Sequence, residues 1–214
     1  VILKGGSEAK YSNRILAEVL RQTASQWDGI PVNALSLIET RDEVSQLVQM
    51  SEELDLIIPR GSNELVKSIQ ARAQVPVLGH ADGICHVYLD ADADLDKARE
   101  VVLDSKTDYP SVCNALETLL VDRDLDSKLL ATIMEDLSEA GVQIRACSET
   151  MKRLEAHSQL KLKDASEEDW QTEYLELILS VKIVAGLDGA VEHINRYGSN
   201  HTDSIVTENR AMAE

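Results

Sequence analysis

The chain has 214 residues, of which 43% are hydrophobic, and it contains only 10 Gly and 4 Pro. This composition supports one large or two small folded domains and argues against intrinsic disorder. A formal net charge of −17 argues against nucleic acid or an anionic membrane as the main partner, because both require a basic face. A local basic pocket for a phosphorylated ligand remains compatible with this charge.

The three cysteines, Cys85, Cys113 and Cys147, are far apart and form no CxxC pair. This spacing argues against a zinc site or a disulfide framework and favours a reducing, cytoplasmic compartment. No apolar run approaches the ~20 residues that span a bilayer, and no secretory signal is visible. The chain begins inside an apolar run at Val1 and stops in the first turn of an expected helix at Glu214, so we expect a piece of a longer protein.

The first 80 residues alternate short apolar runs with segments of helical periodicity. Strands are expected at Val1–Leu3, Val32–Ile38, Leu54–Ile58 and Val75–Leu78. Helices are expected after Ser7, which is a suitable N-cap, over Asp42–Met50, and around Leu65–Ile69. This alternation predicts a parallel sheet with helices on its faces.

The same alternation continues to the end of the chain. Strands are expected at Ile84–Leu89, Thr118–Val121, Val142–Arg145, Leu175–Val184 and Ile205–Val206. Helices are expected at Leu95–Leu103, Ser127–Ala140, Ser148–Leu154 and Leu187–Tyr197. The charged segment Leu160–Asp169 is predicted to be a solvated loop. The whole chain is therefore predicted to be α/β, without a repeat of fixed period.

Two features of the first part could bind a ligand. Gly61 and Ser62 lie between an expected strand and an expected helix, and free N–H groups at a helix N-terminus bind phosphate. The same residues also fit an ordinary capped helix start. Lys4 ends a strand and could face a ligand crevice or simply lie on the surface. His80 could be an acid/base, a phosphate binder or a polar loop residue.

Cys113 stands out among the cysteines because its neighbours are turn formers, namely Asp108, Pro110, Ser111 and Asn114. A cysteine in a turn above an α/β sheet is placed like a nucleophile. Backbone N–H groups exposed there could stabilise a thiolate and hold an oxyanion. Cys85 lies inside a strand pattern and Cys147 beside an apolar strand, so both are interpreted as packed structural thiols.

The segment DSKTDYPSVCNALETLLV, Asp104–Val121, closely resembles the catalytic segment of the γ-glutamyl phosphate reductases. This family belongs to the aldehyde dehydrogenase superfamily and also forms the C-terminal half of bifunctional Δ1-pyrroline-5-carboxylate synthetases. Four other stretches match in the same order: Val1–Arg14, Asp55–Val66, Pro76–Asp90 and Glu192–Glu208. The resemblance covers essentially the whole chain. It implies two three-layer α/β domains, with a partial NADP-binding domain over residues 1–84 and a catalytic domain over residues 85–214.

The resemblance also implies an activity, the NADPH-dependent reduction of L-glutamyl 5-phosphate to glutamate 5-semialdehyde in proline biosynthesis. Cys113 would be the nucleophile that attacks the acyl phosphate, releases phosphate and becomes a thioester, which hydride then reduces. The family further implies a homo-oligomer in the full-length protein. A fusion to a glutamate 5-kinase domain would identify the parent as the bifunctional synthetase.

Several residues match the cofactor-binding positions of the superfamily. Lys4 matches the lysine that contacts the adenosine ribose, and Gly61 and Ser62 match the Gly-Ser pair facing the pyrophosphate. Glu173 matches the glutamate that holds the nicotinamide ribose. Ser7 stands near the position where an acidic residue would favour NAD, so a serine leaves room for a 2′-phosphate. Candidates for binding the amino-acid end of the substrate, by proximity to the motifs, are Lys106, Tyr109, Asn114 and His201.

One position departs from the oxidising members of the superfamily. They carry a water-activating glutamate two residues before the glycine that matches Gly79, whereas this chain has Val77 there. This favours a reductase over an oxidising aldehyde dehydrogenase. A truncated, non-catalytic nucleotide-binding module is the other alternative, and such a copy would be expected to lose Cys113 or Glu173, both of which are present. A sheet without its first strands exposes apolar surface, so we expect the chain alone to be poorly active.

Overall fold

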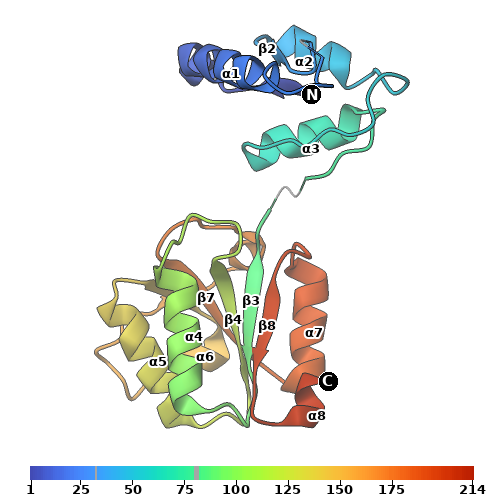
Figure 1. Cartoon of the computed structure of the whole chain (residues 1–214). Coiled ribbons are helices and arrows are strands. Elements are labelled where there is room, and N and C mark those ends of the chain that lie inside the picture. The colour runs from blue at the N-terminus through green and yellow to red at the C-terminus, as the bar shows by residue number, and fades with distance from the viewer. Residues whose placement is uncertain (32, 80–81) are drawn as a thin grey trace. The chain divides into compact units, whose positions relative to one another are not determined.

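The computed structural model describes residues 1–31, 33–79 and 82–214 of the chain (Figure 1). The chain divides into two compact units, Val1–Ala81 and Asp82–Glu214. Both are α/β with parallel strand pairing, as the sequence predicts. The assignment of cofactor binding to residues 1–84 and of catalysis to residues 85–214 stays a prediction.

The first unit holds one short sheet and its helices. Its elements are β1 (Ile2–Lys4), η1 (Ser7–Ala9), α1 (Lys10–Ala24), β2 (Ser36–Ile38), α2 (Arg41–Leu47) and α3 (Asn63–Arg72). β1 and β2 pair in parallel. The strands predicted at Leu54–Ile58 and Val75–Leu78 are wrong in extent, because these runs meet only in an isolated parallel bridge between Ile57 and Val77.

The start of α1 also differs from the prediction. Ser7 is not the N-cap of this helix but opens the 3₁₀ turn η1, which carries no side-chain cap. α1 then begins at Lys10 after Ala9, again without a capping side chain. The physical reason is that the chain enters the helix through a tighter turn, a common device at helix N-termini. Ser7 therefore has no capping role.

One face of α1 is apolar and uncovered within the first unit. Ala17 is its buried residue, whereas Tyr11, Ile15, Leu16, Val19 and Leu20 are exposed. Large apolar side chains clustered on one helix face usually pack against another element. This unit therefore presents a face that its own residues do not cover.

The second unit is built on a six-stranded sheet in the order β6-β5-β7-β4-β3-β8, in which every strand pair is parallel. The strands are β3 (Cys85–Leu89), β4 (Leu116–Asp122), β5 (Gln143–Ala146), β6 (Lys163–Asp164), β7 (Ile178–Val184) and β8 (Asp203–Val206). The helices are α4 (Leu95–Thr107), α5 (Ser127–Glu139), α6 (Ser148–Arg153), η2 (Glu168–Gln171), α7 (Gly186–Tyr197) and α8 (Arg210–Ala213).

Helices cover both faces of this sheet (Figure 1). Val87 and Leu89 point into the larger core with α4 and α5, while Tyr88 and Leu120 point to the opposite face with α7. This alternation follows from the two-residue period of a strand. Every residue of β3 and β4 is buried, as expected for central strands of a parallel sheet that helices cover on both faces. The second unit therefore has the predicted three-layer architecture.

Buried polar residues account for the main boundary errors in this unit. α4 runs to Thr107 and β4 starts at Leu116, beyond the predicted ends at Leu103 and Thr118. Lys106 and Glu117 interrupt the apolar patterns there, although both are buried. Charged residues are almost never fully buried unless paired, so a pattern of hydrophobic residues stops short at such positions.

The segment Leu160–Asp169 is only in part the solvated loop that its charge predicts, because most of its residues are exposed but its two ends are buried. Leu160 and Asp169 are buried, and Lys163–Asp164 forms the edge strand β6. Asp169 accepts a hydrogen bond from Arg145, so its carboxylate is paired inside the fold.

In the described part of the chain, no helix is long and apolar enough to cross a membrane.

Candidate active site

Cys113 lies in the turn between α4 and β4, as predicted, and is half-buried. Backbone hydrogen bonds hold the turn, with Val112 N–H donating to the Tyr109 carbonyl (3.3 Å) and Ala115 N–H to the Val112 carbonyl (3.1 Å). Because β4 begins at Leu116, the thiol sits at the edge where the parallel strands start. A fixed turn at a sheet edge suits a nucleophile that must meet a ligand.

Gly83 is the point at which Cys113 and Glu173 converge. A Cβ placed on Gly83 would lie 2.0 Å from the Cys113 carbonyl oxygen and 2.7 Å from the Glu173 Oε1. Only glycine permits so close an approach of the backbone to both groups. No sequence motif marks Gly83, and its local signal is a glycine just before a buried strand.

A second cysteine supports the turn that holds Cys113. The Cys85 thiol donates to the Cys113 carbonyl (3.2 Å) and lies 3.8 Å from His201 Nδ1. Burial raises the pKa of Cys85 to about 11, which keeps the thiol protonated as a donor. Cys85 is thus a packed thiol, as predicted, and in addition it holds the carbonyl of Cys113.

The four candidates for the amino-acid end of the substrate have different surroundings. His201 is half-buried beside Cys85 and its Nδ1 also lies 2.7 Å from Thr202 Oγ1. Tyr109 and Asn114 are exposed on the Cys113 turn. These three are therefore gathered at one edge of the sheet.

The surroundings of Lys106 contradict the prediction that it contacts the substrate. Its side chain is 0% exposed and Nζ donates to Glu117 Oε2 at 2.8 Å. An ammonium group without access to water needs a carboxylate partner in the fold, and Glu117 is that partner. Lys106 is thus not available to contact a substrate directly.

The remaining candidates belong to the first unit. Lys4 is the last residue of β1 and Ser7 the first of η1, and both are exposed. Ser62 is the N-cap of α3, where its hydroxyl accepts from Leu65 N–H at 3.4 Å. Gly61 has φ of 153° and lies against Leu65. The capped helix start is therefore present, and His80 lies outside the described residues.

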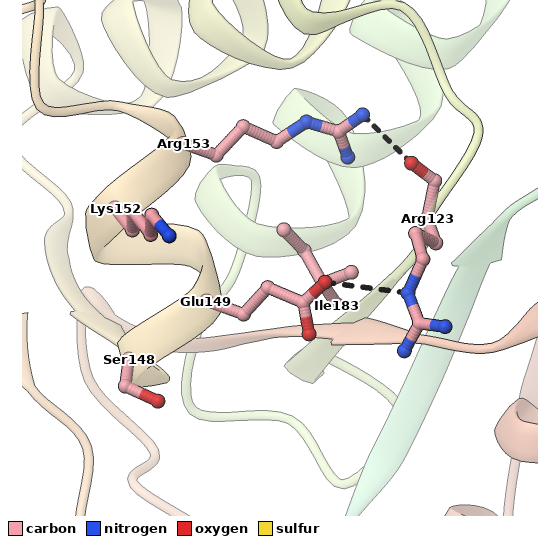
Figure 2. A pocket seen from close by; sticks show the side chains of 6 residues that line it. All are labelled: Arg123, Ser148, Glu149, Lys152, Arg153 and Ile183. Atoms are coloured by element: carbon pink, nitrogen blue, oxygen red, sulfur yellow. Dashed lines mark hydrogen bonds and ion pairs between the residues drawn. The ribbon is translucent and has the colours of Figure 1, made fainter.

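Figure 2 shows a basic pocket of about 650 Å³. Arg123 follows the last residue of β4, so the pocket lies at the opposite end of this strand from Cys113. Its lining residues are Arg123, Ser148, Glu149, Lys152, Arg153 and Ile183. Arg153 donates to the carbonyls of Arg123 and Leu125 at 2.7 Å, and Arg123 Nε donates to Glu149 at 3.3 Å. Two of its cations thus hold loops together, and the pocket is separate from the edge that carries Cys113.

Comparison with known proteins agrees with the resemblance read from the sequence. Residues 1–151 match the aldehyde dehydrogenase family. The γ-glutamyl phosphate reductase of Acetivibrio thermocellus is 50% identical over 213 residues, which are 100% of this chain and 48% of that protein. The γ-glutamyl phosphate reductase 1 of a Synechocystis species is 50% identical over 214 residues, again 48% of its length.

The crystal structure of γ-glutamyl phosphate reductase from Thermotoga maritima superposes with a TM-score of 0.91 at 38% identity, over 99% of this chain and 50% of that one. The chain thus spans about half the length of the relatives it matches. The predicted aldehyde dehydrogenase-like fold and the predicted resemblance to γ-glutamyl phosphate reductases are both confirmed. With the family match extending over residues 1–151, the chain belongs to the aldehyde dehydrogenase family.

Proposed function

We propose that the protein carrying this chain reduces L-glutamyl 5-phosphate to glutamate 5-semialdehyde with NADPH, a step of proline biosynthesis. Relatives named γ-glutamyl phosphate reductase support this at about 50% identity over the whole chain. The observation that carries the proposal is the convergence of Cys113 and Glu173 at Gly83. The backbone of Cys113 and the Glu173 carboxylate both lie against Gly83, which supports their proposed roles as nucleophile and ribose ligand in one site.

The chemistry uses Cys113 twice. Its thiolate attacks the acyl carbon, the bond from that carbon to the phosphate oxygen breaks, and phosphate leaves from a thioester. After hydride reaches the thioester carbon, the carbon–sulfur bond breaks, which releases the aldehyde and regenerates the thiolate. Backbone N–H groups of the turn that holds Cys113 are candidates to stabilise the oxyanion in both steps.

Bound NADPH would supply the hydride. The residues that would hold it are Glu173 at the nicotinamide ribose, Lys4 at the adenosine ribose, and Gly61 and Ser62 near the pyrophosphate. Two acceptor oxygens in the Glu173 carboxylate suit a ribose diol, and the N-terminus of the ten-residue helix α3 suits a phosphate. Ser7, which has no carboxylate, supports NADPH over NADH, and a comparison of KM for the two cofactors tests that choice.

Val77 supports reduction over oxidation. A valine cannot activate the water that would hydrolyse the thioester, so the intermediate is preserved for hydride transfer. The three free cysteines support a reducing, cytoplasmic setting for the reaction. Assembly of the full-length protein into a homo-oligomer, and a fusion to a glutamate 5-kinase domain, belong to the same proposal and follow from the family resemblance alone.

Replacement of the nucleophile in the full-length protein tests the proposal. Cys113→Ser should lower the rate of L-glutamyl 5-phosphate reduction by about 10³-fold or more, because a neutral hydroxyl is a far weaker nucleophile than a thiolate. The matched control is Cys147→Ser, since Cys147 is the N-cap of α6 and serine is a good N-cap. The control should keep the wild-type rate in the NADPH absorbance assay. Equal activity of the two variants would remove Cys113 from the mechanism.

A further inference from the structure

A buried ion pair flanks the Cys113 turn. Lys106 lies in the last turn of α4, and Glu117 is the second residue of β4. Their side chains are 0% and 1% exposed, and Nζ lies 2.8 Å from Oε2. Burial lowers the pKa of Lys106 and raises the pKa of Glu117, while their attraction opposes both changes. Because a buried pair adds little net stability, its place beside the nucleophile asks for another explanation.

The second carboxylate oxygen of Glu117 reaches a third segment. Oε1 accepts a hydrogen bond from the backbone N–H of Leu175 at 3.1 Å. Leu175 has a φ of 56°, a left-handed conformation that is uncommon for a residue other than glycine. Such a conformation persists only where its surroundings hold it. The bond from Glu117 therefore helps to fix the backbone just two residues after Glu173.

Glu117 thus connects the parts of the candidate site. Its carboxylate joins the end of α4, the start of β4 and the segment that carries Glu173. The Cys113 turn lies between the first two of these parts. At the same edge, the Cys113 carbonyl and the Glu173 carboxylate both lie against Gly83. A shift of Leu175 would move Glu173 while the Cys113 turn keeps its own backbone bonds and its bond from Cys85.

We propose that Glu117 is a positioning residue, held in place by Lys106, which sets the Glu173 carboxylate relative to Cys113 through the Leu175 amide. The inference rests on the proposed function, because it assigns the pair to cofactor placement in that reaction. The proposal predicts an effect on cofactor binding without an effect on the cysteine. Loss of the bond to Leu175 should weaken NADPH binding, whereas the intrinsic reactivity of the Cys113 thiol should remain.

Two double variants of the full-length protein separate this role from simple stabilisation. Each variant replaces Lys106 by Met, and Glu117 is replaced by Gln in one (Lys106→Met/Glu117→Gln) and by Leu in the other (Lys106→Met/Glu117→Leu). The two charges are removed in each case, but only the glutamine keeps an oxygen for Leu175 N–H. The Gln variant should keep KM for NADPH within about twofold, and the Leu variant should raise it about tenfold. Alkylation of Cys113 by iodoacetamide, with Cys85 and Cys147 followed by mass spectrometry, should stay within about twofold in both.

Amide hydrogen exchange at Leu175 supplies a readout independent of turnover. Exchange should be about tenfold faster in the Leu variant than in the Gln variant, because only the Gln variant retains the acceptor. If the Leu variant does not fold, Glu117→Asp is the substitute, since it keeps the charge but withdraws the carboxylate from Leu175. It should raise KM for NADPH in the same direction.

Equal KM values and equal Leu175 exchange in the matched pair would overturn the positioning role. So would a loss of Cys113 alkylation that parallels the rise in KM, because that pattern indicates general loosening. A wild-type protein that binds NADPH but does not reduce L-glutamyl 5-phosphate would instead overturn the proposed function. In that case NADPH affinity, measured by titration calorimetry, and Leu175 exchange still decide the positioning role.

Discussion

At the scale of single residues, the contacts that Gly83 and Cys85 make with the backbone of Cys113 shape the candidate site. Gly83 has no side chain because the Cys113 carbonyl and the Glu173 carboxylate occupy the space where one would stand. Cys85 donates its thiol hydrogen to the same carbonyl. The turn that holds Cys113 is therefore fixed by its contacts with Gly83 and Cys85.

Gly83→Ala should disable the full-length enzyme. The new methyl group would meet the Cys113 carbonyl oxygen at 2.0 Å, so the turn or the Glu173 segment must move. We expect kcat/KM for L-glutamyl 5-phosphate to fall by about 100-fold or more, as misplaced catalytic groups commonly cause. The control is Gly189→Ala inside α7, where a Cβ would contact Val184 at an ordinary 3.4 Å. Wild-type kinetics in Gly83→Ala would show that the close approach is unimportant.

At the scale of elements, the contact between β7 and α7 carries a titratable group inside the fold. His193 on α7 is 4% exposed, and its Nδ1 lies 3.1 Å from Lys182 Nζ on β7. Because an ammonium group can only donate, Nδ1 accepts and the imidazole is neutral. Burial, together with the charge of Lys182, lowers the pKa of His193 to about 3.

This shift predicts a loss of stability in weak acid. Since the folded pKa lies below the ordinary value of about 6.5, the unfolded chain binds a proton as the pH falls below 6.5 and the folded chain does not. The contribution of neutral His193 is therefore present above pH 6.5 and is lost as the pH falls toward 3. The free energy of unfolding that is lost for this reason between pH 6.5 and 4.5 should amount to about 2–3 kcal/mol.

His193→Gln keeps an acceptor for Lys182 but has no imidazole to protonate. Between these two pH values its free energy of unfolding should therefore fall by about 2–3 kcal/mol less than that of the wild type. Urea unfolding of the full-length protein at pH 6.5 and 4.5 measures the difference. His157→Gln is the control, because His157 lies on the surface beside Glu135 with 36% of its side chain exposed. An equal pH response in wild type and His193→Gln would contradict a neutral buried imidazole.

At the scale of the whole molecule, the chain spans about half the length of its relatives. Within the first unit, Ile15, Leu16, Val19 and Leu20 on α1 are exposed. A cluster of this kind is a surface that normally lies against something else.

The 214 residues alone should reduce L-glutamyl 5-phosphate at less than about 1% of the rate of a full-length relative, because they cover about half of such a protein and the exposed face of α1 has no covering element among the described residues. They should also bind an apolar dye such as ANS more strongly than the full-length relative, through the exposed face of α1. NADPH oxidation and dye fluorescence, compared at equal concentration, measure both effects. Full turnover by the 214 residues would refute the expectation.

Prediction from sequence succeeded where the signal is local. α5 was predicted over Ser127–Ala140 and spans Ser127–Glu139, because its apolar residues recur with the helical period. It failed where an element depends on a partner. The runs Leu54–Ile58 and Val75–Leu78 look like strands, yet they share only one bridge, since an apolar run becomes a strand only if a neighbour pairs along it.

The sequence by itself determined the α/β class, the parallel sheet and the turn that carries Cys113, because periodicity and turn chemistry act between near neighbours. Recognition of the family likewise needed only the order of matching stretches. The tertiary structure decided that Gly83 brings Cys113 and Glu173 together. It also decided that the buried Lys106 side chain pairs with Glu117 and does not reach a substrate. Gly83, Cys113 and Glu173 lie far apart in the chain, and the Lys106–Glu117 pair joins a helix to a strand across the Cys113 turn. No local sequence pattern encodes either contact.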